Sequence, residues 1–202
     1  MKTAIVLAGG QGSRLNYREK ALLELHGKPI LLRILERLSG SVDDFIIVAR
    51  DRDQQIKLPL SRLPVGRTTV VCDEIRGFGP IAGIYTGLKA SKAAYSFVVA
   101  CDMPYVNASV VDLLFRRASG YDVAIPYPPE PLHAVYKRDV TIEAAKKAIN
   151  EGKGAIMYII DQLRANFVSK EEIQTLDPNL CTFLNINRVQ DIKRLSDQAI
   201  CE

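Results

Sequence analysis

The sequence predicts an α/β protein in which helices cover both faces of a mostly parallel central sheet. Short, continuous apolar runs rich in β-branched residues recur along the chain, which is typical of strands buried on both sides. Segments with apolar residues at helical spacing separate these runs. A chain of 202 residues is long enough for one domain with a substantial core. We therefore expect residues 1–202 to form a single domain with a Rossmann-like three-layer sandwich.

The strands are predicted from apolar runs that end in glycine or polar residues. Gly9-Gly10 follows the first run and Arg50 the second, and Asp73 and Asp102 come after the third and fourth. Glycine and aspartate favour turns, so each run has a defined end. The predicted strands cover residues 4–7, 45–49, 70–72, 97–100, 123–125, 134–136 and 183–184.

The helices are predicted from apolar periodicity and from the residues that begin them. Pro29 precedes one periodic segment and Pro80 opens another, as suits a residue with a fixed φ and no N–H. Ser109 is a good N-cap for the next helix. Four prolines between residues 126 and 131 predict an extended loop. The predicted helices cover residues 30–38, 80–88, 109–119, 140–150 and 155–163, and a last helix begins at Val189.

Charge and composition exclude several classes of protein. The 27 basic residues are scattered among 23 acidic ones and give a net charge of +4. Without a dense basic run, nucleic acid is a poor candidate partner. A small positive excess fits anionic ligands, and a solvated surface alone also explains it. No apolar stretch approaches the ~18 residues of a membrane helix. We expect no membrane partner.

Cysteine usage and the first residues indicate a cytoplasmic protein. Cys72, Cys101, Cys181 and Cys201 lack the spacing of a zinc site, and we expect all four to be reduced. The apolar run behind Lys2 is too short for a signal peptide.

Residues 2–20 carry the features of a phosphate-binding loop. Gly9-Gly10 allows a sharp turn and lets a phosphate approach the backbone N–H groups. Arg14 offers a planar fork and Lys20 a point charge. The loop lacks the Gly-Lys-Ser/Thr triplet of a P-loop, and Leu15 interrupts the dinucleotide fingerprint. A tight turn with two solvated cations is the alternative interpretation.

Two carboxylates follow predicted strands. Ligands bind beyond the carboxyl ends of parallel strands, so residues 9–14, Arg50, Asp73 and Asp102 should converge. Asp102 suits magnesium, which takes few carboxylates when phosphate oxygens and water complete its coordination. The alternatives are a helix N-cap for Asp102 and a turn carboxylate for Asp73. His26 in a turn and His133 beside a strand are more often bystanders than bases.

These residue types favour nucleotidyl transfer. A glycine loop, two cations and a carboxylate can position and neutralise a triphosphate without a protein nucleophile. No Ser/His/Asp set accompanies them.

Five motifs follow one another along the chain. They are Leu7-Ala8-Gly9-Gly10 with Ser13-Arg14-Leu15, Lys20 and Leu25-His26-Gly27-Lys28-Pro29; Gly79-Pro80-Ile81-Ala82-Gly83; Cys101-Asp102-Met103-Pro104; Glu130-Pro131-Leu132-His133-Ala134-Val135-Tyr136; and Asn185-Ile186-Asn187. In this order they resemble the motifs of the nucleotidyltransferase family that includes molybdenum cofactor guanylyltransferase. The resemblance covers nearly the whole chain and implies one nucleotidyltransferase domain.

The resemblance implies transfer of GMP from GTP to molybdopterin, with Mg²⁺ as cofactor and pyrophosphate as product. Arg14, Lys20 and Asp102 would be catalytic, and Asp102 would hold the metal. Asn185 and Asn187 would form the acceptor side. Proteins that deliver or receive the molybdenum cofactor are further possible partners. The implied nucleotide-binding residues are Leu7, Ala8, Gly9, Lys20, Asp73 and Asp102.

The chain departs from the family pattern at three positions. Asn16 and Glu19 stand where the family usually has glycine and aspartate, and Asn16 tolerates a left-handed backbone. Arg50 stands where members that read guanine commonly have asparagine. Arginine cannot accept a hydrogen bond from guanine N1 or N2, so guanine rests on the overall resemblance. The alternatives are a related transferase acting on phospholactate, cobinamide phosphate or a sugar phosphate, and a non-catalytic GTP-binding module.

Overall fold

A seven-stranded sheet forms the centre of the computed structural model, which describes residues 1–9, 19–64, 66–73, 75 and 77–197. Its strands are β1 (Thr3–Leu7), β4 (Asp44–Ala49), β5 (Thr68–Cys72), β6 (Tyr95–Ala100), β7 (Val123–Tyr127), β8 (His133–Lys137) and β9 (Ala165–Ser169). They stand in the order β5-β4-β1-β6-β8-β7-β9. β8 runs antiparallel to both of its neighbours, and the remaining pairs are parallel.

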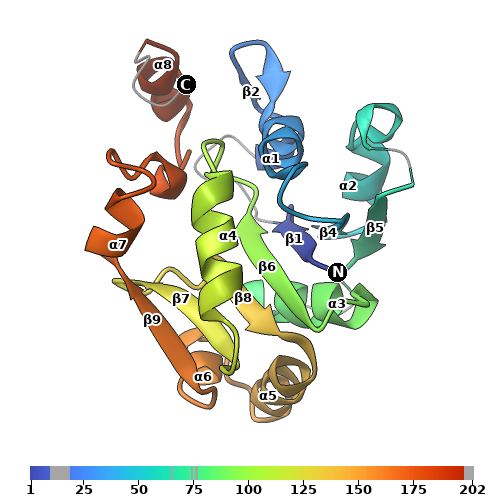
Figure 1. The fold of residues 1–202 in the computed structure, drawn as a ribbon. Coiled ribbons are helices and arrows are strands. Elements are labelled where there is room, and N and C mark those ends of the chain that lie inside the picture. Colours follow the sequence, from blue (N-terminus) through green and yellow to red (C-terminus); the bar gives the residue numbers. More distant parts are fainter. Residues whose placement is uncertain (10–18, 65, 74, 76, 198–202) are drawn as a thin grey trace.

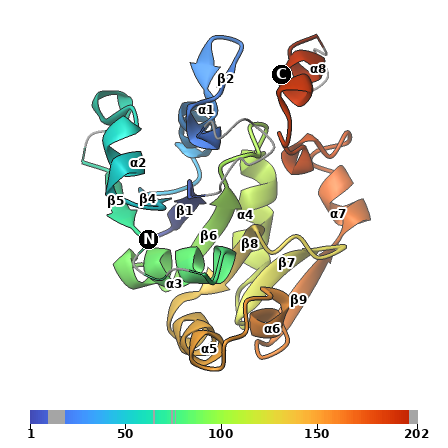
Figure 2. The ribbon, with the colours of Figure 1, turned by 180° about the vertical axis from the view of Figure 1, so that it is seen from behind.

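Helices occupy both sides of this sheet (Figures 1 and 2). They are α1 (Ile30–Leu38), α2 (Arg52–Lys57), α3 (Pro80–Ala90), α4 (Ala108–Arg117), α5 (Arg138–Asn150), α6 (Met157–Ile160), α7 (Lys170–Gln174) and α8 (Val189–Asp197), with 3₁₀ helices η2 (Lys20–Leu22), η3 (Leu60–Arg62) and η4 (Cys181–Phe183). β2 (Glu24–Leu25) and β3 (Lys28–Pro29) form a separate antiparallel hairpin. No helix within the described ranges is long and apolar enough to cross a membrane.

The alternation of side chains along β1 explains the three layers. Ala4 and Val6 lie in the core that contains α1 and α4, whereas Ile5 lies in the core that contains α3, and all three are fully buried. Successive side chains of a strand point to opposite faces, so a strand covered on both sides must be apolar throughout. The α/β class and the two covered faces predicted from the sequence are confirmed.

Most of the predicted elements are confirmed, but the strand at residues 183–184 is wrong. Residues 181–183 form η4, and Phe183 packs against the ring of His133. Two apolar residues were too short a run to distinguish these structures. The sequence also missed β9, in which Val168 is the one fully buried residue. β9 is an edge strand of the sheet and lacks the continuous apolar run of a central strand.

The helix predictions need three corrections. The predicted helix at residues 155–163 is reduced to α6, and the short polar helices α2 and α7 were missed. In α2, Ile56 is 72% exposed, so no apolar periodicity marks the helix. Asn107, not Ser109, caps α4, because its Oδ1 accepts from the N–H groups of Ser109 and Val110.

Two further expectations are corrected. Pro126 lies inside β7, and the connection from β7 to β8 is a short region of turns instead of an extended loop. Cys181 is disulfide-bonded, whereas Cys72 and Cys101 are free as expected. Cys201 lies outside the described residues. Sequence spacing gave no signal for this bond because the cysteines follow no known framework.

Gly87 lets α3 approach the centre of the sheet. A methyl group built on Gly87 would lie 2.4 Å from Cγ2 of Ile5 and 3.2 Å from Cγ2 of Val48. Ile5 is fully buried and its Cγ2 is attached directly to Cβ, so it cannot swing aside. The distance between α3 and the sheet therefore depends on a residue without a side chain.

We expect Gly87→Ala to destabilise the protein by ~1–3 kcal/mol through overpacking. Gly40→Ala is the matched control, because a methyl group there has no heavy atom within 4 Å and Gly40 is exposed. Urea unfolding of the two variants measures the difference. Equal stabilities of the two variants would show that the sheet accommodates the methyl group.

Candidate active site

A cavity of about 700 Å³ lies at the carboxyl edge of the sheet, where parallel strands place ligands. Residues that follow four different strands line it, namely Gly9, Arg50, Asp73 and Asp102. The register pairs Leu7 with both Val48 and Ala100, so these strands end level with one another. The predicted convergence of these residues is confirmed. Arg14 and the other predicted loop residues through 14, except Gly9, lie outside the described part of the chain.

Lys20 and Asp102 form an ion pair at the edge of the cavity. Lys20 Nζ is 2.7 Å from Asp102 Oδ2 and also donates to Asn187 Oδ1 at 3.3 Å. The two paired side chains are only 16% and 17% exposed, so water screens them weakly. Backbone hydrogen bonds hold Asp102 in place, from Cys101 N to Leu7 O and from Ile186 N to Asp102 O. A cation and a carboxylate are thus fixed beside one another at the cavity.

Gly9 lies where two strand ends come close together. A methyl group on Gly9 would meet the backbone N and Cα of Arg50 at 3.2 and 3.3 Å. These distances are tighter than ordinary van der Waals contact, and the neighbouring atoms belong to the backbone. Glycine is therefore the residue that best fits this position, and its backbone stays accessible from the cavity.

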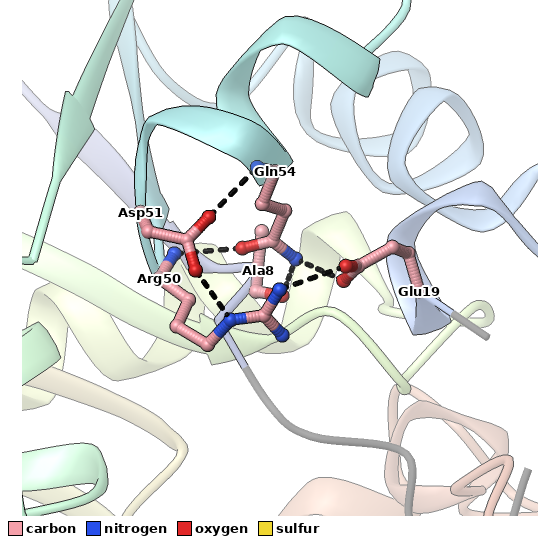
Figure 3. A network of polar contacts seen from close by, with 5 residues as sticks. All are labelled: Ala8, Glu19, Arg50, Asp51 and Gln54. Carbon is pink, nitrogen blue, oxygen red and sulfur yellow. Dashed lines mark hydrogen bonds and ion pairs between the residues drawn. The ribbon is translucent and has the colours of Figure 1, made fainter. Parts of the chain in front are cut away.

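A polar network joins the ends of β1 and β4 to the residue before Lys20 (Figure 3). The Arg50 guanidinium donates to Glu19 Oε1 and to Asp51 Oδ2, both at 2.9 Å. These two hydrogen bonds raise the pKa of Arg50, so it stays charged. Gln54 is fully buried and contacts Ala8, Glu19, Arg50 and Asp51.

Asp73 lies at the cavity and also organises its own turn. Its Oδ1 accepts from Ile75 N at 3.1 Å and from Thr86 Oγ1 at 3.3 Å. These contacts are those of a turn carboxylate, and Asp73 and Ile75 both line the cavity. The structure is therefore consistent with both interpretations of Asp73 made from the sequence.

The remaining candidate residues lie around the cavity in different ways. Leu7 lines it, whereas the Ala8 side chain is buried and the Ala8 carbonyl accepts from Gln54. Asn187 reaches the site through Lys20. The Oδ1 atom of Asn185 is buried and finds no hydrogen-bond donor among the described residues. An unsatisfied buried acceptor of this kind fits a polar ligand group.

Sequence reasoning did not assign roles to Glu19, Gln54 or Glu130. Burial, with a smaller contribution from the negative charge of Asp102, raises the pKa of Glu130. Gln54 lies in a polar segment without periodicity, so no sequence signal could have found it. Glu19 precedes Lys20 and could have been noticed only through that neighbour.

The carboxylates at the cavity suit a divalent cation that is bound together with phosphate oxygens. Within the described residues, no group of three or more His, Cys, Asp or Glu side chains is placed to hold a metal. Mg²⁺ commonly binds one or two carboxylates and completes its coordination with phosphate oxygens and water. Asp102 provides such a carboxylate at the cavity.

These features define the class of the protein as an α/β nucleotidyltransferase. The model of the MobA-like NTP transferase domain matches residues 4–166, and the chain belongs to this family. It is 43% identical to a probable molybdenum cofactor guanylyltransferase of Methanosarcina acetivorans, over 96% of this chain and 89% of that protein. A Methanosarcina mazei protein of the same name is also 43% identical, over 98% and 91%.

A solved structure agrees with these relatives. The crystal structure of molybdopterin-guanine dinucleotide biosynthesis protein A from Archaeoglobus fulgidus superposes with a TM-score of 0.82 at 33% identity. The match covers 98% of this chain and 97% of that one. The similarity therefore extends beyond the segment matched by the family model.

His133 is a buried neutral side chain and not a base at the site. Its ring packs edge-on against Phe97 and Phe183, and its Nε2 lies 3.1 Å from Thr182 Oγ1. Burial lowers the pKa of His133 to about 3. Between about pH 3 and the ordinary pKa of 6.5, His133 binds a proton in the unfolded chain but not in the folded chain. The stability contributed by neutral His133 is therefore lost as the pH falls through this range.

We expect unfolding free energy to drop by up to ~2 kcal/mol between pH 6.5 and pH 5 because of His133. His133→Phe should flatten this part of the profile, measured by urea unfolding at several pH values. His26→Asn, which removes the other histidine at an exposed turn, is the matched control variant. An unchanged slope in His133→Phe would assign the loss to other groups.

Proposed function

We propose that this protein transfers GMP from GTP to molybdopterin with release of pyrophosphate. The observation that carries the proposal is the Lys20–Asp102 pair facing the cavity beside Gly9, because it places positive charge and a metal-binding carboxylate where a triphosphate fits. The relatives named molybdenum cofactor guanylyltransferase support the choice of nucleotide and acceptor. The Archaeoglobus fulgidus structure supports the same acceptor.

The protein acts mainly by positioning and by neutralising charge. The Gly9 backbone and the Lys20 ammonium group hold the phosphates, and Arg14 contributes a second cation to the same role. Asp102 would hold the magnesium ion, which would neutralise negative charge on the phosphate oxygens. Asp73 would bind the nucleotide. The Lys20 ammonium group has three N–H donors and would turn toward a phosphate oxygen.

The reaction needs no general base. An oxygen of the acceptor's phosphate monoester attacks the α-phosphorus of GTP, forming a new P–O–P link as the bond to the β-phosphate oxygen breaks. Pyrophosphate leaves with that electron pair. A second pKa near ~6 leaves such a monoester largely ionised at neutral pH. This agrees with the burial of His133, which is not available to remove a proton.

Contacts to the guanine base are assigned from hydrogen-bonding chemistry. Arg50 only donates, so its contact would be to O6 or N7, the acceptors on one edge of guanine. The carboxylates of Asp51 and Asp73 also line the cavity and can accept from N1 and N2. Leu7 lines the cavity at the end of β1, and the buried Ala8 lies between it and Gly9. Asn185 and Asn187 stand on the acceptor side, where the buried Oδ1 of Asn185 would receive a donor.

We also place the enzyme in the cytoplasm, where proteins that supply or receive the molybdenum cofactor would meet it. The similarity to proteins named molybdenum cofactor guanylyltransferase supports this proposal.

We expect purified protein with GTP, Mg²⁺ and molybdopterin to release pyrophosphate and form the guanine dinucleotide. Asp102→Asn should lower turnover by about 100-fold or more, because the amide holds the metal weakly. A coupled pyrophosphate assay and chromatography of the product measure both effects. Turnover with phospholactate, cobinamide phosphate or a sugar phosphate instead would reassign the acceptor. GTP binding without any pyrophosphate release would leave a non-catalytic binding module.

A further inference from the structure

We propose that Gln54 is a positioning residue for nucleotide binding and acts through Lys20. Its side-chain amide joins the end of β1 to the residue that precedes Lys20. This link fixes where the Lys20 ammonium group meets Asp102 and the phosphates. The inference rests on the proposed function, because it assumes that Lys20 binds the phosphates of a nucleotide.

The Gln54 amide connects three segments of the chain. Nε2 donates to the Ala8 carbonyl at 2.8 Å and to Glu19 Oε2 at 2.6 Å, and Oε1 accepts from Arg50 N at 2.6 Å. Only this orientation satisfies all three contacts, since the two acceptors require N–H groups and the backbone N–H requires an oxygen. Ala8 and Glu19 stand on either side of residues 10–18. One amide therefore ties the segments before and after that stretch together, as Figure 3 shows.

Glu19 is held on its second oxygen as well. Arg50 donates to Oε1 of Glu19 at 2.9 Å while Gln54 donates to Oε2, so the carboxylate is held at both ends. The Glu19 side chain is only 13% exposed, which strengthens these charged hydrogen bonds. The side chain of Glu19 thus has little freedom to move.

Fixing Glu19 also fixes Lys20. Glu19 caps η2, and its carbonyl accepts from Leu22 N at 3.0 Å. Ala21 in the same turn is fully buried. Lys20 is the first residue of this short, anchored turn, and its ammonium group reaches Asp102 at 2.7 Å. A displacement of Glu19 would therefore move the ammonium group relative to Asp102.

A polar side chain at position 54 has no other evident purpose. Gln54 is fully buried in α2, a helix whose other residues are exposed or partly buried. Burying an amide is unfavourable unless it is hydrogen-bonded, and an apolar residue would fill the same space at lower cost. The groups that hydrogen-bond to the Gln54 amide belong to Ala8, Glu19 and Arg50, which lie at or next to the cavity edge.

The test measures GTP affinity, with Mg²⁺ present and no acceptor, by isothermal titration calorimetry. Gln54→Met keeps the length of the side chain and removes its hydrogen bonds. We expect it to weaken GTP binding about tenfold, whereas in a Lys20→Ala background it should weaken binding less than about threefold, because residues that act through each other are not additive. Additive losses in the double variant would overturn the inference.

Ser91→Ala is the matched control. Ser91 is buried and bonds Ser96 Oγ at 2.9 Å, next to the start of β6 at the sheet edge opposite the cavity. The Ser91→Ala variant should have a lower melting temperature and an unchanged affinity for GTP. Gln54→Met with reduced stability but normal GTP affinity would give Gln54 a purely structural role and would also overturn the inference.

The binding experiment separates this inference from the proposed function. A wild-type protein that binds GTP but releases no pyrophosphate when molybdopterin is added refutes the transfer reaction, and the double-variant comparison of Gln54 and Lys20 still decides the role of Gln54. A wild-type protein that does not bind GTP refutes both.

Discussion

The ion pair between Lys20 and Asp102 is the interaction on which the site depends. The two residues are far apart in the chain, and each is brought to the cavity by a different part of the fold. Asp102 follows a central strand, and Lys20 begins a short helical turn held by Glu19 and Gln54. Both side chains are largely withdrawn from water, so each charge needs a partner of opposite sign. Without a ligand, Lys20 and Asp102 serve as partners for one another. A triphosphate and a metal ion can take over these roles without leaving either group unpaired.

The parallel order of the strands makes this pairing possible. β4, β1 and β6 lie side by side with level carboxyl ends, so residues that follow them meet at one edge. Two glycines allow the close approaches that the arrangement needs. Gly87 brings α3 against the middle of β1, and Gly9 brings the end of β1 against Arg50. The sheet thus holds the polar residues that follow these strands close to one another.

The sequence predicted the central strands well because each is buried on both faces. Ala4, Ile5 and Val6 must all be apolar, and such a run is hard to mistake. The same reasoning failed at β9, which is an edge strand with one fully buried residue, and at α2, which is polar and short. It also failed at η4, where two apolar residues were assigned to a strand. An element that is buried on one side only has fewer apolar residues, so its sequence pattern is weaker.

The candidate site was predictable where residues follow strands and unpredictable where they act through hydrogen bonds. Gly9, Asp73 and Asp102 stand at strand ends, so a rule about parallel sheets places them together. Gln54 offers no such signal, because its importance comes from contacts with Ala8 and Glu19 that only the folded chain creates. The contact of Asn187 with Lys20 likewise depends on where the last part of the chain lies.

The most direct test of this account is a crystal structure with Mg²⁺ and a non-hydrolysable GTP analogue. The account predicts the triphosphate between Gly9 and Asp102, with the metal ion on the Asp102 carboxylate and the Lys20 ammonium group turned toward a phosphate. A nucleotide bound elsewhere, with the Lys20–Asp102 pair still closed, would contradict it.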